Sequence, residues 1–268
     1  MPSFTDQLGR IVTLNHPPTR IISLVPSQTE LLYSLGVNVV GITKFCVHPE
    51  NWFFREKPRI GGTKDIHPEK IAALQPDLII ANKEENDREQ IESLAASYPV
   101  WVSDIKTLAD ALAMIRAVGE LVGRSLQGQA LAAQIQNKFD GLSLTPAHSP
   151  HTAYLIWRNP YMAAGSDTFI DDMLRRCGLS NVFAGQDRYP VTNPSVLAAS
   201  GCELVLLSSE PYPFRGKHME ELQSLLPNAT IRLVDGELFS WYGSRLLLAP
   251  AYFQDLIRNL TPLLKSRE

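Results

Sequence analysis

Aromatic residues and arginines gather in segments that the sequence predicts to be loops, and their types could bind a ligand. An indole or phenol ring packs against a flat apolar face, and a guanidinium pairs with an anionic oxygen. Together they would recognise a large, flat, partly anionic ligand; the alternative is that they pack an interface between two lobes. The residues assigned to ligand binding on this ground are Phe45, Trp52, Trp157, Arg158, Tyr161, Arg188, Tyr189, Trp241, Tyr242 and Arg245.

Residue patterns that would indicate catalysis are absent from the sequence. There is no G-x-S-x-G elbow, no phosphate-binding glycine loop, no dinucleotide fingerprint and no H-E-x-x-H. The three cysteines show no C-x-x-C spacing and allow at most one disulfide. Cys46 is interpreted as a buried thiol, and His48 either contributes to a metal site or is a surface histidine. We therefore predict a binding protein, with no catalytic residue and no covalently bound cofactor.

Composition places the chain among ordinary globular proteins. It has 268 residues, of which 44% are hydrophobic and 20% charged, and its net charge is −3. This length suits one large or two small domains. The mildly acidic balance, without a basic cluster, argues against a nucleic-acid partner. The first residues show no export signal, so we expect a periplasmic or cell-envelope location if a leader was removed and a cytoplasmic one if Met1 is native.

Short apolar runs alternate with capped helical segments, and this alternation predicts an α/β fold with mainly parallel sheets. Ser27 and Glu30 have the spacing of a capping box, as do Asp87 and Gln90. Pro68 has the place of a first helical residue. The expected strands are 21–25, 39–42, 77–81, 100–102 and 152–157, and the expected helices of the first half are 27–36, 68–75 and 87–97.

Residues 107–142 keep helical spacing and connect two lobes. They predict one long helix or two helices joined near Gly123. The predicted architecture is two Rossmann-like α/β lobes with central, mainly parallel sheets, joined by a long connecting α-helix. The corresponding domains are an N-terminal lobe (1–106), the connecting helix (107–142) and a C-terminal lobe (143–268).

An internal repeat with an offset of 126 residues relates the two lobes. Pro68 and Pro194 each begin a predicted helix, and a strand opened by an acid follows nine residues later, at 77–80 and 203–206. The same offset aligns Glu84 with Glu210. The alternative is that α/β units in general share such punctuation, but a constant offset across a helix and a strand favours two lobes of like topology.

Several segments, in order, resemble the solute-binding proteins of vitamin B12, haem and iron-siderophore ABC importers, the helical-backbone or class III periplasmic binding proteins. They are residues 20–36 (RIISLVPSQTELLYSLG), Gly61-Gly62-Thr63, residues 71–80 (IAALQPDLII) and residues 241–245 (WYGSR). The resemblance extends from about residue 10 to residue 262.

The resemblance implies a monomer that holds a small-molecule chelate between two lobes with only small closure. It also implies a partner, an ABC permease with its ATPase, whose arginines would meet a carboxylate on each lobe. Glu84 and Glu210 are our candidates for these docking residues, with Glu85 in reserve.

Ligand identity is expected from the details of the resemblance. Pro26 and Ser27, with the helix that follows, are similar to the cobalamin-binding branch, as are residues 241–245. We therefore predict a corrinoid or a related metal chelate. Arg158, Arg188 and Arg245 keep an iron-siderophore or haem receptor open as the alternative. A metal-ion receptor that uses His48, or an intracellular chelate-binding protein, is a further alternative.

Overall fold

The chain forms two compact units, each built around its own sheet. The structure, a computed structural model, describes residues 2–50, 56–142, 144 and 149–265. Unit 1 comprises residues 1–105, 109–136 and 242–245, and unit 2 comprises residues 106–108, 137–241 and 246–268. The boundaries therefore fall at both ends of the helical segment 107–142, and a short stretch near residue 243 returns to unit 1.

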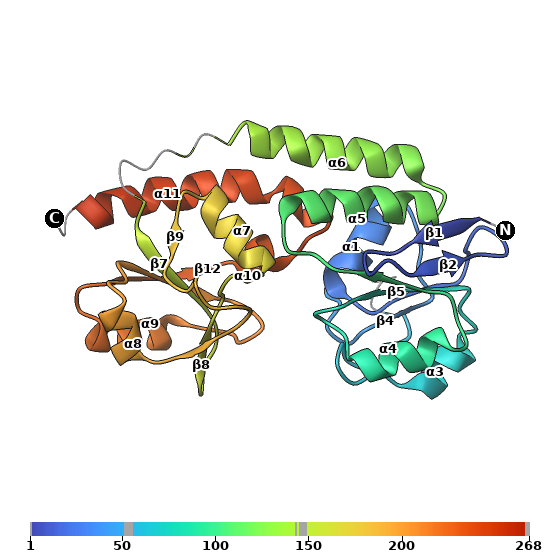
Figure 1. Cartoon of the computed structure of the whole chain (residues 1–268), viewed down its shortest axis with the longest axis horizontal. Coiled ribbons are helices and arrows are strands. Elements are labelled where there is room, and N and C mark those ends of the chain that lie inside the picture. The colour runs from blue at the N-terminus through green and yellow to red at the C-terminus, as the bar shows by residue number, and fades with distance from the viewer. Residues whose placement is uncertain (1, 51–55, 143, 145–148, 266–268) are drawn as a thin grey trace. The chain divides into compact units, whose positions relative to one another are not determined.

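Unit 1 is a parallel α/β unit. Its four-stranded sheet has the order β4-β3-β5-β6, and every neighbouring pair is parallel. Helices cover both faces, with α3 and α4 on one and α1 and α5 (Leu108–Leu121) on the other (Figure 1). A separate antiparallel hairpin precedes it. The elements are β1 (Ser3–Thr5), β2 (Ile11–Thr13), β3 (Ile21–Ser23), α1 (Pro26–Ser34), β4 (Gly41–Ile42), α3 (Pro68–Ala73), β5 (Leu78–Asn82), α4 (Arg88–Ala95) and β6 (Val100–Ser103).

Unit 2 contains a mixed sheet. Its strands follow the order β10-β8-β7-β11-β12, with β9 paired to β7. β7, β11 and β12 are parallel, whereas β8 and β10 add an antiparallel edge. The elements are β7 (His151–Trp157), β8 (Tyr161–Ala163), α7 (Phe169–Arg176), β9 (Ser180–Asn181), β10 (Val191–Thr192), α8 (Pro194–Ala199), β11 (Leu204–Ser208), α9 (Gly216–Leu225), β12 (Thr230–Val234), α10 (Gly236–Ser240), the 3-10 turn η1 (Ser244–Leu247), whose first two residues fall in unit 1, and α11 (Ala249–Lys265).

The two units repeat one folding motif at the predicted offset. α3 and α8 each have six residues and begin at Pro68 and Pro194, and β5 and β11 are also 126 residues apart. The cores match as well, because Ile79 packs in a cluster with α3 and α4, and Val205 packs in a cluster with α8 and α9. The constant offset thus reflects a shared α/β motif.

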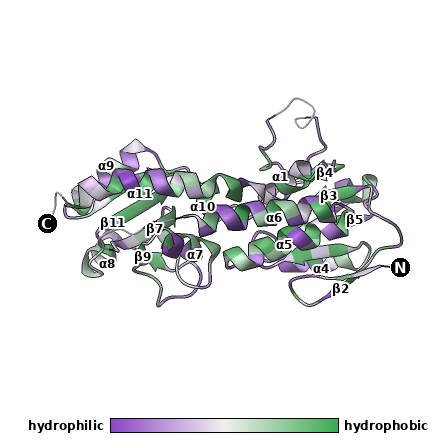
Figure 2. Ribbon diagram, turned by 90° about the horizontal axis from the view of Figure 1, so that it is seen from above, coloured by the Kyte–Doolittle hydropathy of each residue, from purple (hydrophilic) through white to green (hydrophobic). Residues whose placement is uncertain are grey.

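The connecting segment is two helices. α5 (Leu108–Leu121) ends before Gly123, which has φ 69°, and α6 (Ser125–Asp140) follows. This left-handed conformation suits glycine and ends the first helix. Figures 1 and 2 show α5 and α6 side by side, and Gly119 and Gly128 allow their close approach. A Cβ added to Gly119 would lie 2.9 Å from the Gly128 Cα.

Hydrophobic residues concentrate in the strands. β3, β5 and β11 are coloured mainly as hydrophobic in Figure 2, and β5 and β11 are buried along their full length. Such continuous apolar strands are typical of sheets covered on both faces. Within the described residues, no helix has both the length and the hydropathy that crossing a membrane requires.

The capping box predicted at Ser27 is wrong. Val25 is the N-cap of α1 and makes no side-chain cap, Pro26 occupies the first turn, and Ser27 is a buried helical residue. Proline fixes the helical φ and needs no hydrogen-bond partner for its nitrogen, so the N-cap lies two residues earlier than the serine pattern indicates. The predicted cap at Asp87 is confirmed, because its side chain accepts the Gln90 N–H at 3.0 Å.

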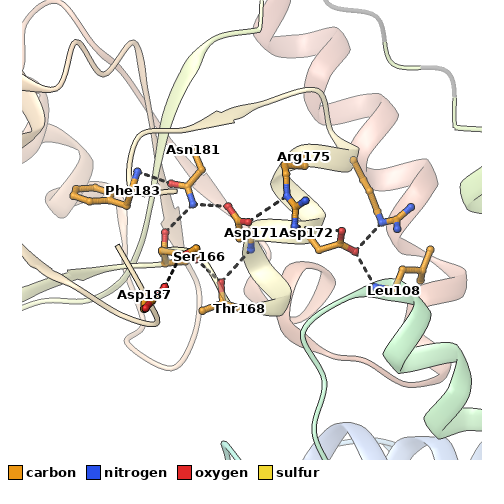
Figure 3. A network of polar contacts seen from close by, with 12 residues as sticks. Leu108, Ser166, Thr168, Asp171, Asp172, Arg175, Asn181, Phe183 and Asp187 are labelled. Atoms are coloured by element: carbon orange, nitrogen blue, oxygen red, sulfur yellow. Dashed lines mark hydrogen bonds and ion pairs between the residues drawn. The ribbon is translucent and has the colours of Figure 1, made fainter. Parts of the chain in front are cut away.

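A buried polar network fixes α7 within unit 2 (Figure 3). The Asp172 carboxylate accepts the backbone N–H of Leu108 and the Arg176 Nε–H, both at 2.8 Å. Asp171 accepts from Asn181 at 2.8 Å and faces Arg175 at 3.2 Å. The two aspartates therefore make their hydrogen bonds and ion pairs within unit 2, where they hold residues 106–108 and β9 against α7.

Candidate functional site

The carboxyl end of β7 presents an aromatic surface in unit 2. Trp157 ends this strand with 41% of its surface exposed, and its ring meets that of Tyr212 edge to face at 5.8 Å. Tyr212 comes from the loop after β11 and contacts Phe214 at 4.8 Å. Carboxyl ends of parallel strands are where α/β folds place ligands. An exposed indole that packs against Tyr212, itself packed against Phe214, is suited to stacking on a flat ligand.

Arg158, next to Trp157, is held by an ion pair. Its Nη2 donates to both carboxylate oxygens of Glu221 at 2.9 and 2.8 Å, and the Tyr161 hydroxyl donates to the same carboxylate at 3.3 Å. Hydrogen bonding to Arg158 lowers the pKa of Glu221, and bonding to Glu221 raises the pKa of Arg158. Both groups are therefore charged at neutral pH, and they compensate each other.

His218 supports the aromatic surface of Trp157, Tyr212 and Phe214 through its contact with Tyr212. Its Nδ1 accepts the backbone N–H of Arg215 at 2.9 Å, and its Nε2 lies 3.4 Å from the Tyr212 hydroxyl. Burial lowers the pKa of His218, followed by repulsion from Lys217. The neutral tautomer with hydrogen on Nε2 fits both contacts, so His218 fixes the start of α9 and the ring of Tyr212.

In unit 1, residues 242–245 pack on the first turn of α1. A Cβ at Gly243 would lie 2.7 Å from the carbonyl oxygen of Ser27, so the close approach requires glycine. Arg245 binds Glu30 of α1 through two contacts, Nε to Oε2 at 3.0 Å and Nη2 to Oε1 at 2.8 Å. Tyr242 is buried in the same segment. Pro26, Ser27, Tyr242 and Arg245 are thus brought together as predicted site residues.

Phe45 lies on the loop after β4, which is fastened to α1. The Cys46 thiol lies 3.2 Å from the hydroxyls of both Thr29 and Thr43. Phe45 itself is 52% exposed, and the ammonium of Lys44 lies 5.1 Å from the centre of its ring. The loop therefore offers an aromatic side chain near the start of α1.

The remaining predicted positions are Arg188, Tyr189, Trp241 and Trp52. Arg188 lies 5.8 Å from the ring of Tyr189, on the loop that leads into β10. Trp241 is buried, and its indole N–H donates to Glu210 at 2.8 Å. Trp52 lies outside the described residues. Trp241 therefore has a structural partner inside unit 2, while Arg188 and Tyr189 form a separate pair.

Glu84 and Glu210 have equivalent backbone positions. Each follows its strand by two residues, and each backbone N–H donates to the side chain that ends the strand, Asn82 at 2.8 Å and Ser208 at 3.3 Å. The Glu210 carboxylate also accepts from Ser240 at 2.6 Å. Burial raises the pKa of Glu210. Both acids are half-buried, and their role in permease docking stays a prediction.

Metal-binding and thiol chemistry find little support. No group of three metal-binding side chains occurs in the part of the chain that the structure describes. His48 lies 4.0 Å from Glu50. All three cysteines are free thiols, and burial raises the pKa of each, that of Cys202 to about 11. A protonated thiol is a poor nucleophile and metal ligand, so these residues act as packing groups.

Comparison with known proteins assigns the family. The model of the periplasmic binding protein family matches residues 21–225, which extend from the start of β3 to the end of α9. This chain belongs to that family. It functions as a substrate-binding protein of an ABC transporter and is not an enzyme. The family is that of periplasmic or otherwise extracytoplasmic binding proteins and lipoproteins.

Relatives of this periplasmic binding protein are distant in sequence. It is 25% identical over 254 residues to the vitamin B12-binding protein of Pectobacterium carotovorum, covering 91% of this chain and 90% of the relative. It is 26% identical over 193 residues to an uncharacterized ABC transporter substrate-binding lipoprotein of Bacillus subtilis, covering 68% and 60%.

Solved structures share the fold of this periplasmic binding protein. A periplasmic haem-binding protein from Roseiflexus sp. RS-1 superimposes with a TM-score of 0.77 at 24% identity, covering 91% of this chain and 98% of that one. The periplasmic vitamin B12-binding protein of Vibrio cholerae gives 0.73 at 21% identity, covering 94% and 98%. The two-lobed α/β architecture predicted from the sequence is thereby confirmed.

Four residues of the site were not predicted as such: Glu30, Tyr212, His218 and Glu221. A sequence signal exists for Tyr212, because it stands between two prolines in the loop that follows an apolar strand. Glu30 was assigned to a cap, and its partner Arg245 is 215 residues away. Glu221 pairs across 63 residues, a distance at which local sequence carries no information on pairing.

Proposed function

We propose that this binding protein captures a corrinoid and delivers it to an ABC permease. The observation that carries the proposal is the exposed Trp157 at the carboxyl end of β7. Its ring packs edge to face against Tyr212, and the charge of the neighbouring Arg158 is compensated by Glu221. A corrin ring offers a broad face for stacking and demands few hydrogen bonds. The relatives named vitamin B12-binding proteins support the same ligand class.

The ion pairs of Arg158 and Arg245 with glutamates favour a corrinoid over a siderophore or haem as the ligand. A receptor for catecholate or carboxylate groups uses guanidinium groups to bind anionic oxygens. Arg158 is engaged by Glu221, and Arg245 is engaged by Glu30, each through two contacts of 3.0 Å or less. An anionic chelate would have to displace a carboxylate at either position, whereas a neutral ring face would not.

Thermal unfolding with added cyanocobalamin tests the proposal. Ligand that binds only the folded protein stabilises it by about 2.7 kcal/mol at a concentration 100 times its dissociation constant. We expect the melting temperature to rise with cyanocobalamin concentration and to rise less with haemin or a ferric siderophore. A rise with haemin or the siderophore alone would replace the corrinoid by that ligand class.

Trp157→Ala is the variant that connects this result to the site. Loss of a central aromatic contact should weaken cyanocobalamin binding about tenfold, which is about 1.4 kcal/mol. Leu233→Ala is the matched control, because Leu233 is similarly exposed but lies on β12. Equal affinities of the two variants would remove Trp157 from the site.

A further inference from the structure

Glu221 occupies an unusual place for a surface acid. It projects from α9, yet its carboxylate reaches the residue that follows β7, where Trp157 stands exposed. Its oxygens accept hydrogen bonds from Arg158 and Tyr161, while its helix neighbour Glu220 is exposed. The pairing is therefore specific to position 221 and is not a general feature of this acidic stretch.

The ion pair remains within reach of a ligand. The side chains of Arg158 and Glu221 keep 26% and 38% of their surface accessible. A carboxylate that approached Arg158 would meet the negative charge of Glu221 at the same place. Binding of that carboxylate to Arg158 would also leave Glu221 without its cation. This cost opposes the replacement of Glu221 by the ligand. The pair therefore discriminates against carboxylate ligands in two ways: Glu221 repels them, and Glu221 already occupies Arg158.

Unit 1 repeats the arrangement with different elements. Arg245, also predicted to meet the ligand, is held by Glu30 of α1 through two contacts. In each unit, then, a helix supplies a glutamate that neutralises an arginine beside an aromatic segment. Single exposed ion pairs contribute little to stability, so stability alone gives no reason for such a pair in both units. The recurrence therefore supports a role in ligand selection over a chance surface pair.

We infer that Glu221 is a specificity-determining residue: by keeping Arg158 in an ion pair, it excludes chelates that bind through carboxylate or catecholate groups and favours a ligand with an uncharged contacting face. This inference rests on the proposed function for the identity of the favoured ligand. Its exclusion of anionic chelates is a property of the Arg158–Glu221 pair itself.

Glu221→Gln tests the inference, because glutamine keeps the shape and removes the charge. Binding of haemin, ferric citrate and cyanocobalamin is measured by titration for the wild type and the variant. We expect the dissociation constants for haemin and ferric citrate to fall at least about tenfold relative to that for cyanocobalamin, since Arg158 becomes available for charge-assisted hydrogen bonds. Glu220→Gln, which removes one charge from the same helix, should leave the ratio unchanged.

The double variant Glu221→Gln/Arg158→Gln separates this mechanism from a general loss of negative charge. It should lose the gain, because no guanidinium remains. Melting curves of all variants establish that they fold. An unchanged ratio in a folded Glu221→Gln, or an equal gain in Glu220→Gln or in the double variant, would overturn the inference. Failure of the proposed function is a different result, the absence of cyanocobalamin binding in the wild type, and the anionic chelates still test Glu221 in that case.

Discussion

At the scale of single residues, the surroundings of a side chain decide its role more than its type does. Glu84 and Glu210 share a backbone position, and the surroundings of Glu210 include Ser240 and Trp241, which both donate hydrogen bonds to its carboxylate. Arg158 and Arg245 were predicted from their type to meet anionic oxygens, and each meets one from the protein's own glutamate. The sequence indicates which residue types could bind a ligand but not which partners these side chains have.

Glu210 leads to a prediction on pH. Its raised pKa means that the folded protein holds the proton more tightly than the unfolded chain does, so its contribution to stability is present below the ordinary value of 4.5 and is lost as pH rises through the folded-state pKa. Glu210→Gln removes this titration and keeps an oxygen for Ser240 and Trp241. We therefore expect the variant to gain stability relative to the wild type as pH rises from 4.5 to 7.5.

Urea unfolding at both pH values checks this expectation for Glu210. The matched control is Glu220→Gln, because Glu220 is exposed and its stability difference from the wild type should not follow the same course. A difference between Glu210→Gln and the wild type that stays constant across this pH range would contradict the assigned environment.

At the scale of elements, the 126-residue repeat was the most informative part of the sequence. It placed α3 with α8 and β5 with β11, and it also relates Gln75 (φ 44°) to Gly201 (φ 67°), the residues that follow the two helices. The sequence did not predict β8 and β10, because strands of three and two residues carry no alternating pattern. Their partners along the chain are set by tertiary pairing.

Gly201 gives a prediction at this scale. Its left-handed conformation ends α8, and a non-glycine residue there adopts it at a cost of about 1 kcal/mol. We expect Gly201→Ala to lower the free energy of unfolding by about this amount, measured by urea titration. Gly185→Ala is the control, since Gly185 has open space around its Cα and no positive φ, and it should be neutral or slightly stabilising. Equal effects at both positions would contradict the helix-end role of Gly201.

At the scale of the whole molecule, family membership and fold leave the permease contact as the next question. The repeat gives each unit an acid two residues after an equivalent strand, Glu84 after β5 and Glu210 after β11. A substrate-binding protein of an ABC transporter implies a permease partner. Two symmetric or near-symmetric permease halves would meet equivalent positions of a repeated fold. Loops after strands are suited to this, because they carry function on a rigid framework.

Charge removal at both acids tests this docking role. We expect Glu84→Gln/Glu210→Gln to lower the affinity of the ligand-loaded protein for its cognate permease, reconstituted in lipid discs with its ATPase, by about tenfold or more, since truncating a paired interfacial charge costs at least about 2 kcal/mol. Glu89→Gln/Glu220→Gln removes the same charge from exposed positions on α4 and α9 and should bind as the wild type does. Ligand titration of each variant shows whether the change is confined to the permease contact. If both double variants bind the permease equally, docking depends on other residues, and Glu84 and Glu210 retain only their shared structural position at the ends of β5 and β11.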